Sequence, residues 1–436
     1  MQIAVRAWSA LTTEQKERVL RRSEIQIDEV KPVVEAIIAR VRAGGDAELV
    51  KITSEIDGIT LDAEKLKVSE DEFDRAHRAL DSSVRDALDF AVENVSRFHS
   101  HQVPKKPVPV EVRPGVTATE RATPIDRVAL YVPRGRGSFP SMLYMLAIPA
   151  SLAGVRSVSI LTPPGENGEI DAACLYAASI CGVRTVYRLG GAHGVAAVAY
   201  GTETVQPVDK IVGPGGTYVS AAKRMLSHIV DIGLPAGPSE SMIIADSTAD
   251  AWTVALDLAT EAEHGSDSAA LLVTPDSRLA SEVAEALGEL IEEAPEPRRT
   301  FLRDVFSEYG GVITVGSIDD AVALANEYAS EHLQIRTVDP HETAARITNA
   351  GEILLGRYTP FTLANYAAGA NAVLPTGGKA RTWSSVSVRD FMKYSSIVEI
   401  DNAGYDAMKS HVGRLAEYEG FPQHAAALRR RAERGI

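Results

Sequence analysis

The sequence predicts an α/β protein with two Rossmann-like parallel-sheet domains, an N-terminal helical segment and a C-terminal helical arm. Three observations lead to this fold class. The chain has 436 residues, enough for two or three domains of about 150 residues each. Strand-like and helix-like segments alternate from residue 110 onward, as they do in βαβ units. The strand-like segments are apolar throughout, which indicates that helices cover both faces of the sheets.

The N-terminal segment, about residues 1–105, has the periodicity of helices. Apolar residues recur at helical spacing from Val34 to Val41 and from Ala87 to Val95. Ser69 followed by Glu72 fits a capping box at the start of a helix. No chemistry is evident here, so we expect this segment to serve packing or a dimer surface.

Strands and helices then alternate through a first α/β domain, about residues 106–240, and a second, about residues 241–380. A C-terminal dimerisation arm of helices follows at about residues 381–436. The predicted strands are 110–120, 127–132, 157–162, 185–189, 210–212, 242–245, 269–273 and 312–315. The predicted helices after residue 105 are 170–181, 194–200, 218–229, 250–264, 278–292, 412–418 and 423–434.

Composition and charge narrow the class of protein. The formal net charge is −14 at pH 7. A surface that follows nucleic-acid phosphates needs positive charge, so nucleic acid is not an expected partner. The N-terminus lacks the apolar region of a signal peptide. The most apolar run, Met142 to Val155, is short and contains Pro149, so we expect no membrane span and a soluble cytoplasmic protein.

The two cysteines, Cys174 and Cys181, lie in one apolar stretch. Their spacing does not fit a CxxC redox pair, and two such residues make no disulfide framework. We expect buried structural thiols. An aldehyde dehydrogenase that uses a thiol nucleophile is therefore disfavoured, since that chemistry needs an activated cysteine.

The stretch from Asp257 to Asp267 carries the first candidate site. Glu261 and His264 are three residues apart, and on a helix this spacing places both side chains on one face. A carboxylate and an imidazole so placed could share a divalent metal such as zinc. A solvated helix end with two acids and a histidine is the alternative.

Glycine-rich loops form a second pattern. In a parallel sheet, ligands bind beyond the carboxyl ends of the strands, and the start of a helix offers free N–H groups to phosphate. Each loop alone could be an ordinary tight turn, and none is a GxGxxG fingerprint. Together they indicate a ligand-lined rim made by the loops 133–137, 190–194, 213–216 and 237–240.

A third candidate is the pair Glu331 and His332, at the start of an apolar strand. Histidine is the usual general base near neutral pH, and a neighbouring carboxylate could activate water. A surface histidine at a strand entry is the alternative.

With these motifs in order, the chain resembles the histidinol dehydrogenase family from about residue 25 to 432. The motifs that carry the resemblance are Tyr131-Val132-Pro133, Gly190-Gly191-Ala192, Lys210 to Gly215, Ala236 to Glu240, Glu261 to Gly265, Glu331-His332-Leu333, Val373 to Thr376 and Glu419 to His424. The resemblance implies a homodimer that oxidises a small-molecule alcohol to a carboxylate in two NAD-dependent steps, with one bound Zn²⁺ per subunit.

The resemblance also implies a role for individual residues. His332 looks like the general base for hydride removal, and Glu331 like the residue that activates water for the aldehyde-to-acid step. The implied dinucleotide-binding positions are Tyr131, His193 and Gly216. The implied substrate-binding positions are Ser239, Glu261, His264, Asn365, Glu419 and His424. Glu261, His264, Asn365 and His424 are also the implied metal ligands, with His424 supplied by the partner's C-terminal arm.

Departures from the family pattern lie at ligand positions. Where the family has a glutamine and an aspartate as metal ligands, this chain has Glu261 and Asn365, so one carboxylate and one amide remain. His193 replaces a glutamine and Gly216 an asparagine at the dinucleotide, and Ala372 replaces a histidine that contacts substrate. We interpret these changes as retained catalytic machinery with altered substrate recognition.

Three functions stay open at this point. The first is oxidation of L-histidinol or a related polar alcohol. The second is oxidation of another polar alcohol, such as a sulfonated propanediol. The third is a catalytically inactive, ligand-binding relative. The sequence also leaves open whether the metal is zinc or another ion, and whether the dinucleotide is NAD or NADP. It leaves open as well whether the oxidation stops at the aldehyde.

Overall fold

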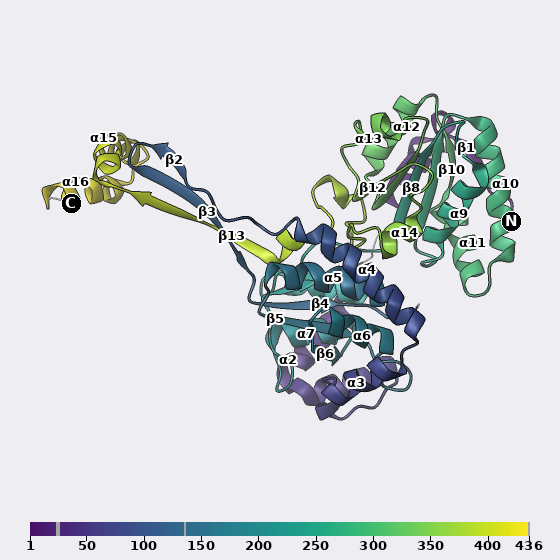
Figure 1. The fold of residues 1–436 in the computed structure, drawn as a ribbon, viewed down its shortest axis with the longest axis horizontal. Coiled ribbons are helices and arrows are strands. Elements are labelled where there is room, and N and C mark those ends of the chain that lie inside the picture. Colours follow the sequence, from purple (N-terminus) through teal and green to yellow (C-terminus); the bar gives the residue numbers. More distant parts are fainter. Residues whose placement is uncertain (23–26, 135–136, 435–436) are drawn as a thin grey trace. The chain divides into compact units, whose positions relative to one another are not determined.

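The computed structural model describes residues 1–22, 27–134 and 137–434, which form two compact units. Unit 1 comprises Met1–Gln102 and Ile125–Phe391 and contains two parallel sheets, each layered between helices (Figure 1). Unit 2 comprises Val103–Pro124 and Met392–Ile436. The predicted α/β class is confirmed. In the part of the chain that the structure describes, no helix is both long enough and apolar enough to cross a membrane.

The four-stranded sheet has the order β6-β5-β4-β7, and every neighbouring pair is parallel. The chain builds outward from β4 to β6 and then returns to the other side of β4, so the order reverses between β4 and β7. In open parallel sheets such a reversal opens a crevice at the carboxyl ends of the two strands. The strands are β4 (Arg127–Tyr131), β5 (Ser157–Thr162), β6 (Thr185–Arg188) and β7 (Lys210–Val212).

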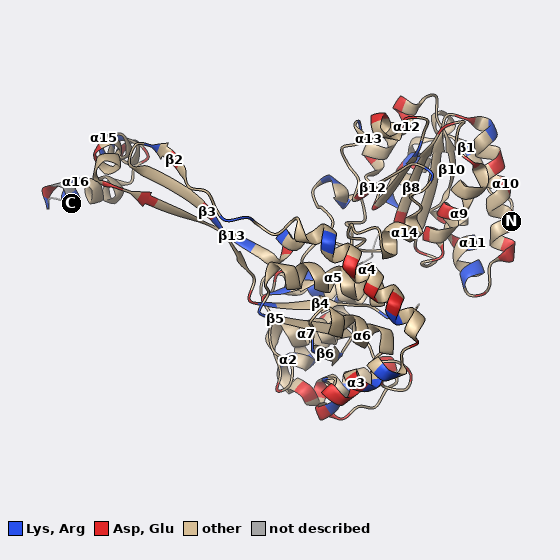
Figure 2. Ribbon diagram, viewed as in Figure 1, with Lys and Arg blue, Asp and Glu red and all other residues tan. Residues whose placement is uncertain are grey.

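Two groups of helices cover this sheet. One group packs against an apolar core that includes Ala129, Leu161 and Ile211, and the other packs around α5. Acidic and basic positions are interspersed along α3 and α4 (Figure 2). The first group is α2 (Ile27–Asp57, interrupted at Gly45), α7 (Gly191–Tyr200) and α8 (Thr217–Leu226). The second is α3 (Glu70–Ala79), α4 (Ser82–Ser100), α5 (Pro140–Ala153) and α6 (Ala172–Ile180).

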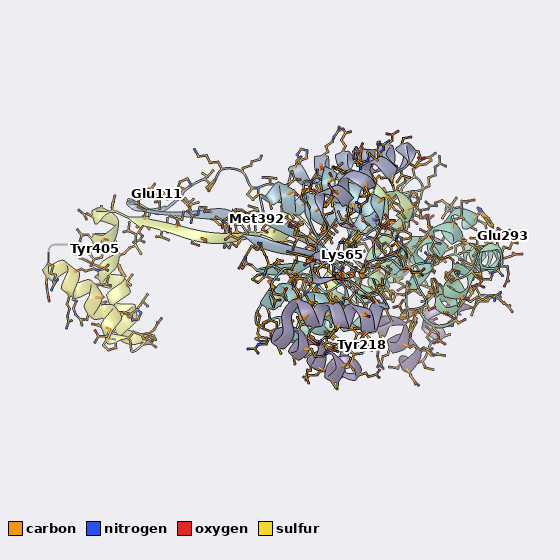
Figure 3. All side chains as sticks on the ribbon, turned by 90° about the horizontal axis from the view of Figure 1, so that it is seen from below. Lys65, Glu111, Tyr218, Glu293, Met392 and Tyr405 are labelled. Carbon is orange, nitrogen blue, oxygen red and sulfur yellow. The ribbon has the colours of Figure 1, made fainter. Side chains whose placement is uncertain are left out.

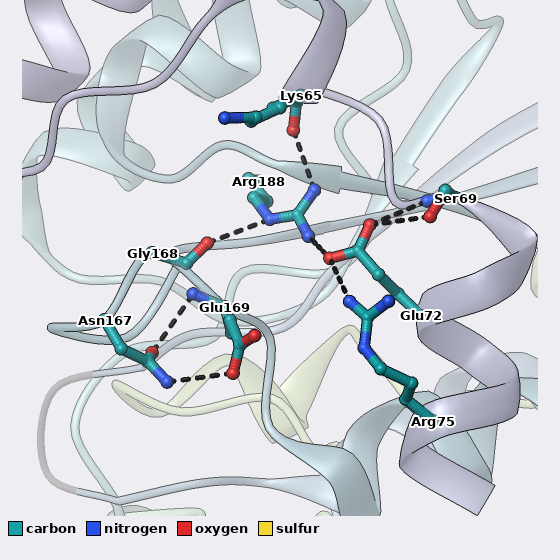
Figure 4. A network of polar contacts seen from close by, with 8 residues as sticks. All are labelled: Lys65, Ser69, Glu72, Arg75, Asn167, Gly168, Glu169 and Arg188. Atoms are coloured by element: carbon teal, nitrogen blue, oxygen red, sulfur yellow. Dashed lines mark hydrogen bonds and ion pairs between the residues drawn. The ribbon is translucent and has the colours of Figure 1, made fainter.

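A buried arginine ties the N-terminal helices to this sheet (Figure 4). Arg188, at the end of β6, donates to the carbonyl oxygens of Gly168 at 2.9 Å and Lys65 at 2.7 Å, and it pairs with the Glu72 carboxylate. Glu72 also accepts from the Ser69 amide at 2.9 Å, so the predicted capping box is confirmed. The start of α3 and the turn after β5 are therefore held by one guanidinium.

Replacing Arg188 by methionine is expected to lower the free energy of unfolding by about 2 kcal/mol, because two part-buried carbonyl groups lose their donor and the Glu72 carboxylate loses its buried cation. Chemical denaturation of both proteins measures the difference. The control is Arg184→Met, since Arg184 pairs with Glu70 at the surface and lies 5.1 Å over the Phe73 ring, contacts that together should matter by about 1 kcal/mol. Equal effects of the two substitutions would contradict a structural role for the buried network.

The six-stranded sheet has the order β1-β10-β9-β8-β11-β12, with every neighbouring pair parallel. Its order reverses between β8 and β11. The N-terminal strand β1 belongs to this sheet although it starts the chain, so the segment 1–105 is not wholly helical. The strands are β1 (Val5–Ala7), β8 (Glu240–Ala245), β9 (Ala269–Thr274), β10 (Gly311–Thr314), β11 (His332–Arg336) and β12 (Glu352–Leu355).

Side chains alternate between the two faces of this sheet, and each face has its own core. Ile243 and Leu272 face one set of helices, and Met242 and Leu271 face the other. The helices on the first face are α9 (Ala251–Ala262), α10 (Ser277–Glu293), α11 (Arg298–Glu308) and α14 (Phe361–Tyr366). Those on the second are α1 (Thr13–Arg21), α12 (Ile318–Tyr328) and the short α13 (Pro340–Ala344).

Unit 2 is an antiparallel ribbon with two helices. Its strands have the order β13-β3-β2 and expose most of their side chains, so the ribbon has little core of its own. Figure 3 labels Glu111 on β2 and Tyr405 on α15. The elements are β2 (Val110–Arg113), β3 (Val116–Pro124), β13 (Met392–Ile400), α15 (Asn402–Tyr418) and α16 (Pro422–Glu433).

For two of the elements absent from the predicted set, α5 and β13, the absence has a physical explanation. α5 is apolar on nearly all sides and contains Pro149, so it lacks the amphipathic period that reveals a surface helix. β13 is exposed along most of its length, so it lacks the apolar run that marks a buried strand. The structure of both segments is determined by the elements they pair or pack with, and their own sequence periodicity does not reveal it.

Candidate active site

The candidate catalytic residues lie at the amino-terminal edge of the six-stranded sheet. His332 begins β11 and Ser239 directly precedes β8, with the Ser239 backbone carbonyl accepting from the Ala269 amide at 2.9 Å as β9 begins. The prediction that the loop 237–240 lies beyond carboxyl ends of strands is therefore wrong, because this loop enters β8 rather than leaving it. The side chains come from strand starts and from the last turn of α9.

One face of β11 carries a row of buried polar side chains toward α9. His332, Gln334 and Arg336 alternate along the strand and so share a face. Asp257 of α9 lies 2.7 Å from the Gln334 amide nitrogen and 3.7 Å from Arg336. Glu261 is one helical turn further along α9, which places it at the His332 end of the row.

His332 is buried and held on two sides. Its Nδ1 lies 3.0 Å from Oε2 of Glu352, and its ring meets Phe361 edge-on at a centroid distance of 5.8 Å. Burial disfavours the imidazolium. The charge of Glu261, the hydrogen bond that His332 donates to Glu352 and the charge of Glu331 outweigh this effect and raise the pKa of His332 to about 10.

Glu331 points to the opposite face from its neighbour. Burial raises its pKa to about 8, against the opposing effects of the His332 charge and of a hydrogen bond from the Glu240 amide, 2.9 Å from Oε2. Glu240 is itself buried 3.4 Å from Nε of Arg22, and its Oε1 accepts from the Gly377 amide at 2.5 Å. Arg22 stacks on Tyr328 at 3.6 Å. A buried ion pair thus lies directly behind the candidate water-activating carboxylate.

Glu261, His264 and Asn365 come together although they are far apart in sequence. The Asn365 amide nitrogen donates to Oε1 of Glu261 at 2.7 Å, and Oε2 of Glu261 lies 3.7 Å from Nδ1 of His264. The helix expected to reach His264 ends at Ala262, so His264 follows the helix C-cap, but its ring still folds back onto Glu261. Glu261 and His264 are therefore close together, as their spacing predicts, although the helix ends before His264.

These three residues fit a metal site in part. The Oδ1 atom of Asn365 is buried and has no hydrogen-bond partner within the described residues, so an acceptor atom stands ready beside a buried carboxylate. Within those same residues no three His, Cys, Asp or Glu side chains group as metal ligands. This chain therefore offers a carboxylate, an imidazole and an amide oxygen, and a complete site needs a further ligand.

The candidate dinucleotide residues lie around the reversal point of the four-stranded sheet. Tyr131 ends β4, and its hydroxyl accepts from the Gly191 amide at 3.1 Å; burial raises its pKa to about 12. Gly216 precedes α8, and the space where a side chain would stand is open. Lys223 of α8 donates to the Gly213 carbonyl at 3.0 Å and so fixes the loop between β7 and α8. Residues 135 and 136 of the loop 133–137 lie outside the described part of the chain.

His193 differs from its expected placement, because its side chain is fully buried. Its Nε2 lies 3.4 Å from Oγ1 of Thr53 on α2. A ring in this position reaches the protein interior rather than a ligand rim.

Replacing His193 by glutamine should make the protein less sensitive to acid. Burial lowers the pKa of His193 to about 4, below its ordinary 6.5. The unfolded chain therefore takes up this proton first as the pH falls. The stability linked to it is full above pH 6.5 and is lost toward pH 4, by up to about 3 kcal/mol.

Urea unfolding at pH 7.5 and pH 4.5 tests this. The drop in unfolding free energy between the two pH values should be smaller in His193→Gln by about 2 kcal/mol. The exposed His341→Gln is the control. An unchanged pH dependence in His193→Gln would show that His193 takes up its proton without penalty.

Glu419 and His424 belong to unit 2, where Glu419 caps the end of α15 and His424 lies in the first turn of α16. Both are exposed, and the His424 ring packs against Phe421 at 5.3 Å. Cys174 and Cys181 are buried, as predicted, and burial raises the thiol pKa values to about 11 and about 12. Neither thiol is suited to nucleophilic attack.

Comparison with known proteins decides the family. A model described as histidinol dehydrogenase matches residues 20–432. The chain belongs to the histidinol dehydrogenase family. As a member of this family it is an oxidoreductase of the dehydrogenase class.

Its relatives cover almost the whole chain. Histidinol dehydrogenase of Synechocystis sp. is 47% identical over 97% of this chain and 98% of that protein. A histidinol dehydrogenase homolog of Rhizobium meliloti is also 47% identical, over 97% of this chain and 92% of that protein. The crystal structure of histidinol dehydrogenase from Elizabethkingia anophelis has a TM-score of 0.93 and 31% identity, covering 99% of this chain and 98% of that one.

Two features of the site escaped sequence reasoning. Glu352, which contacts the candidate base, lies twenty residues downstream at the start of an ordinary apolar strand. Arg22 lies at the end of a surface helix and gave no sign of a buried partner. A predicted pairing of β11 with β12 in register could have found Glu352, whereas nothing in the sequence around Arg22 points to Glu240.

Proposed function

We propose that this protein oxidises a polar primary alcohol through an aldehyde to a carboxylate, with NAD as the hydride acceptor. The observation that carries the proposal is the buried His332, held against Glu352 beside Glu261 at the sheet edge. A histidine enclosed by carboxylates is arranged to take a proton, which an ordinary core histidine is not.

The chemistry assigns one task to each residue. In the first step His332 would take the alcohol O–H proton, and bound NAD⁺ would supply the acceptor for the C–H hydride, which would leave the aldehyde. Glu331 then removes a proton from water as its oxygen adds to the aldehyde carbon. A second hydride would then be lost from the hydrate to another NAD⁺ while His332, neutral again, takes a hydrate O–H proton, and the resulting carboxylic acid would ionise to the carboxylate. The raised pKa of Glu331 suits a residue that must accept a proton near neutral pH.

The dinucleotide is proposed to bind where the four-stranded sheet reverses its order, near Tyr131 and Gly216. The open space at Gly216 lets a ligand approach the start of α8. His193 is proposed to contribute through its backbone, because it is the third residue of α7 and its side chain is buried. The N–H groups at the start of that helix suit a phosphate.

Zinc is proposed to bind Glu261, His264 and Asn365, with His424 from a second copy as the remaining ligand. The buried, unpartnered Asn365 oxygen supports this set. When bound, the ion would supply positive charge for the alcohol oxygen and would offset the charge of Glu261, which lowers the pKa of His332 toward neutrality.

A homodimer is proposed because unit 2 exposes apolar side chains without a core to cover them. The large exposed ones on its strands and helices are Val110, Val112, Tyr394, Ile397, Val398, Ile400, Val412, Leu415, Tyr418 and Phe421. Exposed apolar surface of this extent is typical of a protein–protein interface. The second copy would also bring Glu419 and His424 to the site, as the family resemblance implies.

An amino alcohol such as L-histidinol is the substrate that the charges favour. The Glu352 carboxylate contacts His332 and the charge of Glu261 also acts on it, and a cationic amine complements these two carboxylates better than an anion. The second candidate is another polar alcohol, such as a sulfonated propanediol. This second candidate is favoured by Ala372, which stands where the family has a histidine that contacts substrate. A relative named histidinol dehydrogenase and one named histidinol dehydrogenase homolog are both 47% identical to this chain, so identity does not choose between the two substrates.

NADH formation by the purified, zinc-supplemented protein tests the proposal, with metal content measured on the same sample. L-histidinol is compared with polar diols, sulfonated propanediol and other amino alcohols. Turnover of histidinol supports the first substrate, and turnover of another alcohol supports the second. Bound metal with no NADH from any alcohol would refute catalysis and favour the ligand-binding relative.

A further inference from the structure

Glu352 and His332 are direct register partners on neighbouring strands. β11 and β12 run parallel, and His332 lies opposite Glu352 in the ladder. Paired residues of neighbouring strands project their side chains to the same face of a sheet. The Glu352 amide also donates to the Glu331 carbonyl at 2.9 Å, which fixes this register at the strand start. The backbone therefore determines that the two side chains meet.

Their contact is short and shielded from water. Nδ1 of His332 and Oε2 of Glu352 are 3.0 Å apart, and their side chains are 4% and 8% exposed. Phe361 packs edge-on against the imidazole from another element. The ring is thus held at one nitrogen and along one side, which leaves little freedom to rotate.

The other two carboxylates near His332 have different partners. Glu331 accepts from the Glu240 amide on the opposite face, and Glu261 is bonded to Asn365 and lies 3.7 Å from His264. Among the described residues, Glu352 is the side chain with a hydrogen bond to the His332 ring.

We propose that Glu352 is a positioning residue for the general base. It accepts the Nδ1 proton of His332, orients Nε2 toward the substrate and stabilises the ring when it gains a proton. This inference rests on the proposed function for its kinetic effect, but the hydrogen bond itself can be tested without turnover. A carboxylate in this position fixes the tautomer of a histidine base.

The first experiment detects the hydrogen bond directly. Protein labelled with ¹⁵N-histidine should show a strongly downfield, ¹⁵N-coupled ring proton at Nδ1 of His332. The signal should disappear in both His332→Asn and Glu352→Leu and persist in Glu342→Gln, which removes an exposed carboxylate of α13. A signal that persists in Glu352→Leu, or that is absent from the wild type, would overturn the proposal.

The second experiment measures kinetics on the alcohol that the wild type oxidises. Glu352→Leu should lower kcat by about 10- to 100-fold with KM changed less than about threefold, since orientation of the base is lost and substrate contacts remain. Glu352→Gln keeps an acceptor oxygen and should recover part of the rate. Glu342→Gln should match the wild type.

The decisive combination is Glu352→Leu in a His332→Asn background. If Glu352 acts through His332, the second substitution lowers kcat no further, because residues that act as a unit are not additive. A full additional loss would show a purely structural role. Loss of the ring-proton signal in Glu352→Leu without wild-type turnover of any alcohol would retain the positioning contact and refute the proposed function instead.

Discussion

Replacing His332 by asparagine is expected to lower the kcat of NADH formation by about 10³-fold, within the usual range for removing a general base. The alcohol proton then has no buried acceptor at the amino-terminal edge of β11. Binding of the dinucleotide should change little, because its proposed residues lie at the other sheet. Steady-state kinetics together with a dinucleotide titration separate the two effects.

His341→Asn serves as the matched control, since His341 is an exposed histidine on α13. A melting curve of His332→Asn checks that loss of rate is not loss of fold. An unchanged kcat in a folded variant would remove His332 from the mechanism, and a large fall in the control would show that the assay responds to histidine loss in general.

The second large effect is expected on zinc affinity, when the carboxylate of the candidate metal site is first removed and then exchanged with the amide. Glu261→Gln leaves two amides beside His264 and is expected to weaken zinc binding by about 10²-fold, since amides are poor zinc ligands. Glu261→Gln combined with Asn365→Asp places the carboxylate at position 365 and the amide at position 261. This double variant should return the zinc affinity to within about tenfold of the wild type.

Competition with a chromogenic zinc chelator measures these affinities on the full chain. Glu263→Gln is the control, because Glu263 is an exposed acid two residues from Glu261. If Glu261→Gln binds zinc as tightly as the wild type, Glu261 is not a ligand. If the double variant binds zinc as weakly as Glu261→Gln, charge balance does not explain why the carboxylate and the amide have exchanged positions in this chain.

Much of the fold followed from local pattern. The strand predicted at 210–212 coincides with β7, and the helix predicted at 278–292 differs from α10 by one residue at each end. Such elements have strong apolar signals and clear ends. α5 and β13 could not be found in this way, because burial on nearly all sides hides the helical period and exposure hides a strand.

The site was predictable where neighbours in sequence are neighbours in space. Glu331 beside His332 and Glu261 near His264 are such pairs. Glu352 was not predictable, because its contact depends on the register of two strands. The rule that ligands bind at carboxyl ends did not predict where the candidate residues lie, since the last turn of α9 brings Glu261 to the opposite edge of the sheet.

The position of β11 between β8 and β12 has a consequence for how the site opens. The ladder to both neighbours begins at His332, so the amide hydrogens of this strand should exchange with solvent only when the whole sheet unfolds. α14, which carries Asn365, has six residues and exposes Leu363 and Tyr366, so its amides should exchange far sooner. Brief opening of α14 would then move Phe361 and Asn365 away from His332, while the contact with Glu352 still holds the imidazole.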